Sequence, residues 1–273
     1  MQELEEAVFV KVLFIGDIVG NVGRKALKEN LPYLKSKYKP HVIIVNGENA
    51  AAGRGITGAI ANEFFNWGVH GITLGNHTWD NKDIFDFIDD EPRMIRPANF
   101  PPGTPGRGYT VVKGEGKELA IVNLQGRTFL PAIDCPFRAA DEIVDELRKN
   151  YKCILVDMHA EATSEKIAMG WHLDGRASFV VGTHTHVQSN DERILPGGTA
   201  YLTDAGMVGP RDGILGMERE AVLRKFYTQL PVRFVVDDGK WHFHGAVVDI
   251  DEATGAATRI EKIRLMEDEW RME

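Results

Sequence analysis

The chain has 273 residues, of which 43% are hydrophobic, so it can bury the core of one large domain or of two small ones. Its formal net charge of −8 argues against broad electrostatic binding to nucleic acid, and its longest apolar runs have the length of strands rather than of membrane spans. Its two cysteines lack the spacing of a metal site and its acidic amino-terminal segment lacks a secretory pattern, which together favour a cytoplasmic location.

Strands and helices alternate in the first half of the chain. The predicted strands are short apolar runs, at residues 9–15, 41–45 and 71–74. Helices are predicted from apolar residues at helical spacing or from a capping residue, at 23–37, at 57–67 with Thr57 as cap, and at 82–89. This alternation is typical of a parallel sheet. A loop rich in proline and glycine follows at 97–108.

The second half combines a hairpin signal with further apolar runs. Residues 109–113 and 119–124 are predicted to form a hairpin that turns at 114–117. Further strands are predicted at 153–158, 178–181, 199–202, 232–236, 240–249 and 257–265, with a short β segment around Ile194. Helices are predicted at 141–150, at 164–171 with Ser164 as cap, and at 218–226. The remaining loops are 123–129, which contains Arg127, and the glycine-rich segment 204–216, to which we assign no chemical role.

Five predicted strands are followed directly by polar side chains. In chain order these are Asp17; Glu48 and Asn49; Asn76 and His77; His159; and His184 and His186. In open α/β sheets, ligand sites form beyond the carboxyl ends of the strands. The stretch 182–186 is the most distinctive, because residues two apart in extended chain point to the same side, so that His184 and His186 can reach one site.

Each of these residues also has an ordinary structural interpretation when taken alone. Asp17 would cap the following helix, residues 46–49 would form an exposed turn, and His159 would be a hydrogen-bonded core histidine. Their coincidence at strand ends favours one shared site instead. A second His-x-His, formed by His242 and His244, lies inside an alternating strand, and we interpret it as part of a solvated sheet face outside the site.

The candidate ligands suggest a metal centre. They are carboxylate, amide and imidazole groups without a thiolate, a mixture that suits Fe, Mn or Zn. The seven candidate metal ligands are Asp17, Glu48, Asn49, Asn76, His159, His184 and His186. They are too many for one ion with an open position, so we expect two divalent or transition metal ions bridged by a carboxylate. Because only two ligands are charged, the metals leave an excess of positive charge that favours a phosphate ester.

In their order along the chain, these residues resemble a known superfamily. An Asp after the first strand, an acidic residue with Asn, a Gly-Asn-His, a further His and a Gly-x-His-x-His are similar to the motifs of the calcineurin-like metallophosphoesterases. Four fuller stretches resemble its YmdB-like branch: FIGDIVG at 14–20, NGENA at 46–50, LGNHTWD at 74–80 and DMHAEATSEK at 157–166. The resemblance covers nearly the whole chain, so we expect a single domain over 1–273, with 1–8 as a flexible or additional segment.

The resemblance implies a four-layer α/β/β/α sandwich and a phosphodiesterase, with 2′,3′-cyclic nucleotides as the substrate class of this branch. One metal would be held by Asp17, Glu48, Asn49 and His186, and the other by Glu48, Asn76, His159 and His184. Glu48 would then be the bridge, and His77 matches the superfamily's catalytic histidine. The resemblance is also compatible with a homo-oligomer.

The sequence departs from the general superfamily pattern at three places. The usual Asp-x-His is Asp17-Ile18-Val19 here, and Asn49 would fill the place of the missing imidazole. Glu48 replaces the bridging Asp, and both changes leave the identity of the metals open. Thr78 follows His77 where an acidic residue is usual, so that Asp80 would orient His77 instead.

The mechanism that we expect is attack of a metal-bound hydroxide on phosphorus, with protonated His77 donating to the departing ribose oxygen. The partner would be a small-molecule phosphodiester, with no stable nucleic-acid binding and no membrane. A metal-dependent regulatory protein that binds nucleotides would use the same ligands, and a phosphomonoesterase or protein phosphatase would share the fold. An amidohydrolase ranks lower, because its His-x-His usually follows the first strand of a barrel.

Overall fold

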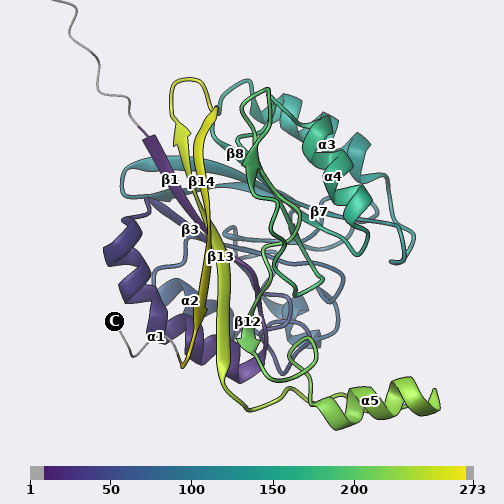
Figure 1. Ribbon diagram of the computed structural model, residues 1–273. Helices are drawn as coiled ribbons and strands as arrows, with labels where there is room; N and C mark the ends of the chain where they lie inside the picture. The colour runs from purple at the N-terminus through teal and green to yellow at the C-terminus, as the bar shows by residue number, and fades with distance from the viewer. Residues whose placement is uncertain (1–8, 269–273) are drawn as a thin grey trace, which may run out of the picture.

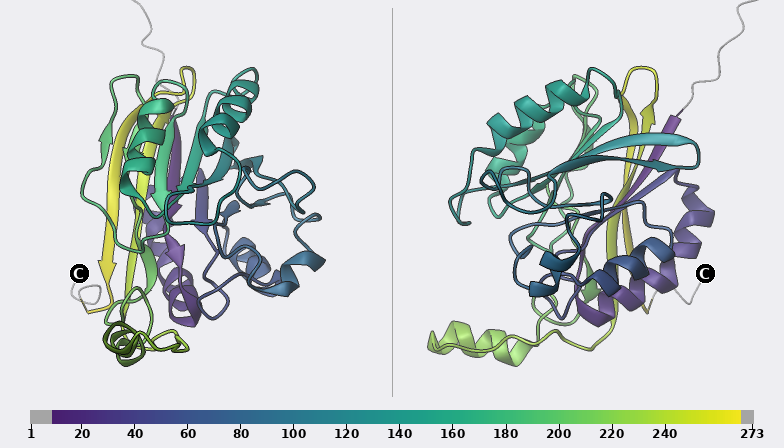
Figure 2. Two further views of the ribbon diagram at one scale, coloured as in Figure 1. Left: turned by 90° about the vertical axis from the view of Figure 1, so that its right-hand side faces the viewer. Right: turned by 180° about the vertical axis from the view of Figure 1, so that it is seen from behind.

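The computed structural model describes residues 9–268, and the expected additional segment at 1–8 lies outside that range. The described strands form two sheets that face each other, with helices on the outer sides (Figures 1 and 2). The first sheet has the order β2-β12-β13-β1-β3-β4-β5, with β14 paired to β13. The second has the order β10-β11-β9-β8-β7-β6.

The bounds of the elements are as follows. The first sheet consists of β1 (Phe9–Ile15), β2 (Asp17–Ile18), β3 (Val42–Asn46), β4 (Gly71–Thr73), β5 (Met94–Ile95), β12 (Met207–Pro210), β13 (Trp241–Asp251) and β14 (Ala257–Met266). The second consists of β6 (Tyr109–Gly114), β7 (Lys117–Gln125), β8 (Ile154–His159), β9 (Phe179–Thr183), β10 (Arg193–Ile194) and β11 (Ala200–Leu202). The helices are α1 (Gly20–Tyr38), α2 (Gly58–Asn66), the 3₁₀ helix η1 (Lys82–Asp86), α3 (Pro136–Leu147), α4 (Thr163–His172) and α5 (Arg219–Thr228).

Hydrophobic clusters within the described residues separate four layers. One packs α1 and α2 onto the first sheet, through side chains such as Leu27, Phe64 and Val45. Another joins the inner faces of the sheets, where Phe14 of β1 meets Phe179 of β9 edge to face with ring centroids 6.3 Å apart. A further cluster packs α3 and α4 onto the second sheet. The α/β/β/α sandwich is therefore confirmed.

The pairing of the strands follows from their sequence patterns. The apolar strands β1, β3 and β4 pair in parallel, as do β7, β8 and β9. The β6–β7 hairpin turns at Glu115 and Gly116, both with positive φ, which suits the twist of a two-residue hairpin loop. Thr57 caps α2 as predicted, because its side chain accepts a hydrogen bond of 3.2 Å from the backbone N–H of Ile60. Within residues 9–268, no helix combines the length and apolar character that a membrane crossing requires.

Several local predictions are wrong. The segment 204–216 is not only a loop, because its residues 207–210 form β12 between β2 and β13. Residues 232–236 form no regular strand, and only Val236 makes an isolated bridge, to Met217. Ser164 is not a cap, since α4 begins at Thr163 after Ala162 and shows no side-chain capping bond. For β12 the reason is tertiary, because the strand forms by pairing with the distant β2 and β13.

We expected the second His-x-His to lie on a solvated face, and this prediction is wrong. His244 is buried and His242 is partly buried, with ring centroids 4.2 Å apart on β13. Burial lowers the pKa of His242 to about 4 and that of His244 to about 3. The alternation of β13 puts these rings on the side of Ala246 and Val248, which pack between the two sheets. The pattern of β13 thus showed that they share a face, but not that loop residues such as Gly206 cover His244.

Candidate active site

The predicted site residues come together at the carboxyl ends of strands from both sheets. Asp17 lies in β2, and Glu48 and Asn49 follow β3. Asn76 and His77 follow β4, His159 ends β8, and His184 and His186 follow β9. Asp17 does not cap α1, whose capping position is Val19 and shows no side-chain capping bond. The residues predicted at the strand ends therefore lie close together in the structure, and their side chains form two neighbouring groups.

The first group surrounds the Nε2 atom of His159. This atom lies 3.0 Å from Glu48 Oε1, 2.9 Å from Asn76 Oδ1 and 3.1 Å from His184 Nδ1. His159 is fully buried and Glu48 almost so. The ligand atoms of Glu48, His159 and His184 all lie within 4.8 Å of one another, a span that one ion can bridge. A single proton on Nε2 cannot serve three acceptors at once, so the arrangement is better matched to a cation.

The second group consists of Asp17, Asn49 and His186. The Nε2 atom of His186 lies 3.3 Å from Asn49 Oδ1 and 3.8 Å from Asp17 Oδ1. Asp17 is fully buried, and its Oδ1 atom has no hydrogen-bond partner among the described residues. A buried carboxylate oxygen without a partner is costly unless something else, such as a cation, compensates for it.

The outer nitrogen of each imidazole is held by a hydrogen bond. Nδ1 of His186 lies 3.1 Å from the carbonyl oxygen of Leu215, which can only accept, so this nitrogen carries the proton. His159 Nδ1 lies 2.9 Å from the hydroxyl of Thr183, which itself donates to Asp157 at 2.7 Å.

Both arrangements leave Nε2 of these two rings directed into the site. His184 is reversed: its Nε2 lies 3.0 Å from Glu161 Oε2, and its Nδ1 faces His159. Metal-ligating histidines are oriented by outer partners in this way, which fix the tautomer and the ring.

The charges of the two groups are strongly coupled. Although burial alone would raise the pKa of Glu48, the neighbouring His159 and His77 lower it to about 2. Burial alone would lower the pKa of His159, but the facing carboxylates, with Glu48 foremost, raise it to about 9. Burial raises the pKa of Asp17 well above its usual range. Burial and the charge of His159 lower the pKa of His184 to about 3. In the absence of metal, a proton on His159 therefore takes the place of a positive ion.

We expected the loop that carries the first His-x-His to be extended, but it is not. His184 and His186 have φ angles of 100° and 64°, a region that residues other than glycine rarely adopt. Their side chains enter different groups. The conformation is held by Asp204, whose Oδ2 atom accepts hydrogen bonds from the backbone and hydroxyl of Thr185 and from the Nζ atom of Lys166, at 3.1, 2.7 and 2.6 Å. Strain of this kind is typical of functional loops.

His77 lies beside the two groups without belonging to either. Its Nδ1 atom is 2.8 Å from Asp80 Oδ2, and its backbone N–H donates to Glu48 Oε2 at 3.0 Å. The orientation of His77 by Asp80, which we inferred from the sequence, matches this contact. Arg54 Nη1 approaches the same Asp80 carboxylate at 3.8 Å, and its side chain is 63% exposed. His77 is therefore held in place with Nε2 left for a substrate.

A cavity of about 350 Å³ opens over the two groups. Glu48, Asn49, His77, His184 and His186 lie along one side of it. Residues 214–234 add a mostly apolar lining, which also contains Lys225. Its volume lies in the range of small-molecule sites.

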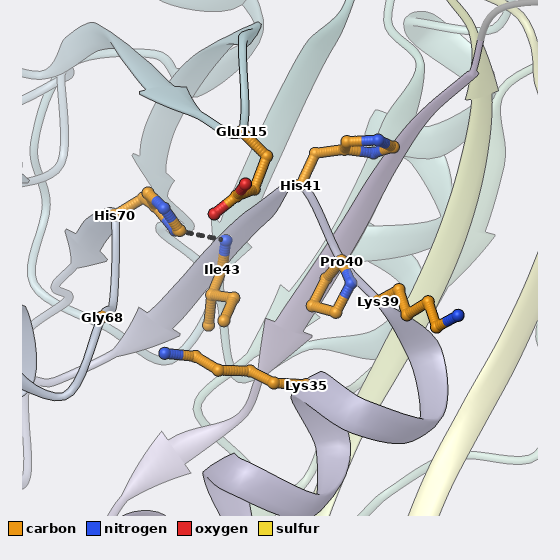
Figure 3. Close-up of a pocket in the computed structure, with 8 residues that line it drawn as sticks. All are labelled: Lys35, Lys39, Pro40, His41, Ile43, Gly68, His70 and Glu115. Atoms are coloured by element: carbon orange, nitrogen blue, oxygen red, sulfur yellow. Dashed lines mark hydrogen bonds between the residues drawn. The ribbon is translucent and has the colours of Figure 1, made fainter.

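A second cavity, of about 620 Å³, is separate from this site (Figure 3). It lies at the amino ends of β3 and β4, and its lining contains none of the candidate ligands. His70 projects toward it, but its Nδ1 atom accepts a hydrogen bond of 3.0 Å from the backbone N–H of Ile43, and His41 is likewise engaged with the N–H of Lys11 at 2.9 Å. The chemistry of the molecule is thus concentrated at the carboxyl ends of the strands.

The sequence reasoning missed several residues that shape the site. Asp204 and Leu215 lie in the segment to which we assigned no role, and Lys166 appeared only within a family motif. Asp204 follows the apolar strand β11, so the strand-end criterion would have identified it. Arg127 contributes no lining to the cavity, and its guanidinium instead approaches Cys135 Sγ at 3.4 Å.

The donor set fits divalent cations. Three acceptors converge on one nitrogen, a buried carboxylate oxygen lacks a partner among the described residues, and the outer nitrogens of all three imidazoles are engaged. Oxygen and imidazole donors without a thiolate suit Fe, Mn or Zn. No contact described here joins Glu48 to Asp17, so the bridge between two metals stays a prediction.

Comparison with known proteins places the chain among described relatives. The family model of the YmdB-like proteins matches residues 13–263. A Bacillus subtilis (strain 168) protein named 2′,3′-cyclic-nucleotide 2′-phosphodiesterase is 60% identical over 95% of this chain and 98% of its own length. A solved structure of a Mycoplasma pneumoniae protein described as a novel phosphatase has a TM-score of 0.90 at 33% identity and covers 98% of both chains. A hypothetical protein from Thermus thermophilus has a TM-score of 0.88 at 40% identity, covering 94% of this chain and 99% of that one.

Proposed function

This chain belongs to the family of YmdB-like proteins, and from that premise we propose that it is a metal-dependent phosphodiester hydrolase that acts on 2′,3′-cyclic nucleotides. The observation that carries the proposal is the pair of ligand groups at the strand ends, with His77 beside them. The name of the Bacillus subtilis relative supports the substrate class. Two free cysteines, Cys135 and Cys153, support the expected cytoplasmic location.

We assign the metals to the residues named in the sequence analysis. Asp17, Asn49 and His186 would hold one ion, Asn76, His159 and His184 the other, and Glu48 would bridge them. When bound, such ions activate water and stabilise negative charge on the phosphoryl oxygens. Their identity would be Fe, Mn or Zn, which the donor set does not distinguish.

The protein's own residues supply orientation and a proton. Nε2 of His77 is free to donate to the departing ribose oxygen, because Nδ1 is engaged by Asp80. The exposed Arg54 lies on the same cavity and adds positive charge where an anionic substrate would enter. Hydrogen bonds to the carbonyl of Leu215 and to the hydroxyl of Thr183 hold His186 and His159 in the proposed ligand orientation before a substrate arrives.

The first test measures metal content and activity on the same purified protein. We expect about two transition metal ions per chain, and hydrolysis of 2′,3′-cyclic AMP that is lost on chelation and restored by adding metal back. A phosphoserine peptide serves as the comparison substrate. Preference for the peptide would favour a protein phosphatase, and two metals with hydrolysis of neither substrate would favour a regulatory protein that binds nucleotides. A folded protein that takes up no metal would contradict the proposal.

A further inference from the structure

The apolar side of the active-site cavity is built by a segment that projects from the sandwich. In Figures 1 and 2, α5 extends away from the two sheets. The apolar wall of the cavity consists of Ile214, Leu215, Met217, Val222, Phe226 and Phe234. Phe226 is 70% exposed and Phe234 40% exposed, so two aromatic rings face solvent directly beside buried polar ligands.

The wall is tied to the candidate metal ligands. The carbonyl of Leu215 accepts a hydrogen bond of 3.1 Å from Nδ1 of His186. This bond orients His186 and therefore couples a wall residue to a candidate ligand. The backbones of Ile214 and Met217 bond each other at 2.8 and 3.0 Å, and Glu218 N–H donates to the Val235 carbonyl at 2.9 Å. These bonds hold both ends of the wall in fixed relation to the ligands.

The two sides of the cavity match the two ends of a cyclic nucleotide. The polar side offers positive charge and donors for a phosphodiester, and the apolar side offers flat aromatic surface within the same 350 Å³. A 2′,3′-cyclic nucleotide carries its phosphate on one face of the ribose and its base on the neighbouring carbon of the ring. A site that used only the diester would have no need of exposed phenylalanines at this position.

We propose that Phe226 and Phe234 form a nucleobase subsite, in which the base of the substrate stacks while its cyclic phosphate lies at the ligand groups. This inference rests on the proposed function and specifies how that site recognises its substrate. The apolar wall side chains offer no hydrogen bond to the edge of a base, although Lys225 of α5, which lines the same cavity, offers a positively charged donor. Stacking on aromatic rings tolerates every base, so the subsite selects nucleotides over base-free diesters without choosing strongly among adenine, guanine, cytosine and uracil.

The test compares a substrate with a base and one without. Phe226→Ala and Phe234→Ala are assayed on 2′,3′-cyclic AMP and on ribose 2′,3′-cyclic phosphate, both with the metal-loaded enzyme. We expect kcat/KM on the nucleotide to fall about ten-fold, mainly through KM, and to fall at most about two-fold on the base-free diester. Phe226→Trp, which keeps an aromatic face, should retain most of the activity on the nucleotide.

Tyr227→Ala is the matched control. Tyr227 is the next residue on α5, is 86% exposed and does not line the cavity. Its replacement should therefore leave kcat/KM unchanged on both substrates. Molecular mass in solution is measured for every variant by light scattering.

An equal fall in kcat/KM on both substrates, or no fall on either, in the phenylalanine variants would contradict the proposed nucleobase subsite. So would a change of oligomeric state in the Phe226 variant, since it would assign the ring to contacts between copies of the chain. Wild-type protein that hydrolyses neither diester would remove the proposed function itself, whereas hydrolysis of both with unaffected phenylalanine variants removes only this inference.

Discussion

At the scale of single residues, the candidate site depends on which atom each imidazole presents. His159 and His186 have their outer nitrogens engaged by Thr183 and Leu215, so both present Nε2 to the site. His77 is held the same way through Nδ1, but no contact among residues 9–268 joins its Nε2 to a candidate ligand, which fits its proposed role as proton donor. The outer hydrogen bond thus orients each ring, and the surroundings of Nε2 distinguish the proposed ligands from the proposed proton donor.

Replacing His77 with Ala tests this separation of roles. We expect kcat to fall by about 10²–10⁴-fold, the usual effect of losing a general acid, while the metal content stays unchanged. Asp80→Asn, which keeps a hydrogen-bond partner for His77 but removes its charge, should show a smaller loss. The measurement is steady-state kinetics paired with elemental analysis of the same samples. Loss of metal in parallel with activity would make His77 a ligand rather than a proton donor.

At the scale of elements, a buried ion pair joins α4 to the loops after β9 and β11. The Nζ atom of Lys166 on α4 lies 2.6 Å from the carboxylate of Asp204, and Lys166 is fully buried and Asp204 nearly so. The same carboxylate holds Thr185 between the two histidines of the loop. An interaction between elements therefore stabilises the positive φ angles of His184 and His186.

Lys166→Met should destabilise the protein by about 3–5 kcal/mol, because Asp204 would remain as a buried charge without its cation. The midpoint of unfolding in urea, measured on the metal-free protein, gives this difference. Lys240→Met is the control: Lys240 pairs with Asp268 at 2.6 Å, but both side chains are about half exposed, so the loss should be below about 1 kcal/mol. Similar losses of unfolding free energy in the two variants would show that the buried Lys166–Asp204 pair stabilises the protein no more than an exposed pair.

At the scale of the whole molecule, two sheets contribute to one site, and a metal or a proton is needed to balance its charges. Glu48 and Asp17 come from the first sheet, whereas His159, His184 and His186 come from the second. The two layers are held together by the apolar cluster between them and by the ligands at their edge. If the site holds metal as proposed, its removal should affect the stability of the sandwich as well as catalysis.

The metal-free protein should lose stability as the pH rises from 6.5 to 9. The folded pKa of His159 is raised from 6.5 to about 9, so its contribution is complete below pH 6.5 and disappears as the pH passes about 9. The expected loss is on the order of 3 kcal/mol. The other histidines with shifted pKa values, His41, His70, His184, His186, His242 and His244, are all lowered, so their contributions change below pH 6.5 instead.

Thermal unfolding with and without chelator at pH 6.5, 7.5 and 9 measures this effect. A bound metal replaces the proton on His159, so the metal-loaded protein should not show the decline. His159→Gln in the metal-free state is the control, and its stability should be flat across the same pH range. A decline of equal size in the metal-loaded wild type would place its cause elsewhere in the molecule.

The amino-acid sequence by itself determined most of the strands, the parallel pairing in the first half of the chain and the positions of the polar residues at strand ends. Apolar runs followed by Asp17, Glu48 or His159 are local patterns, and the geometry of a parallel sheet brings such ends together without further information. The four layers followed from the family motifs and are seen in the packing of Phe14 against Phe179.

Only the tertiary structure decided how the site is held and what covers it. Asp204 and Thr185 are hydrogen-bonded although they are 19 residues apart in the sequence, and Leu215 and His186 although they are 29 apart. Neither pair can therefore be recognised from a local sequence pattern. The burial of His244 depends on distant segments, such as the loop at Gly206, that its own strand does not reveal. The apolar wall could not be inferred either, because Phe226 and Phe234 have no pattern that separates a subsite from a surface. Local patterns specify which way side chains point along an element, whereas contacts between distant segments specify what those side chains meet.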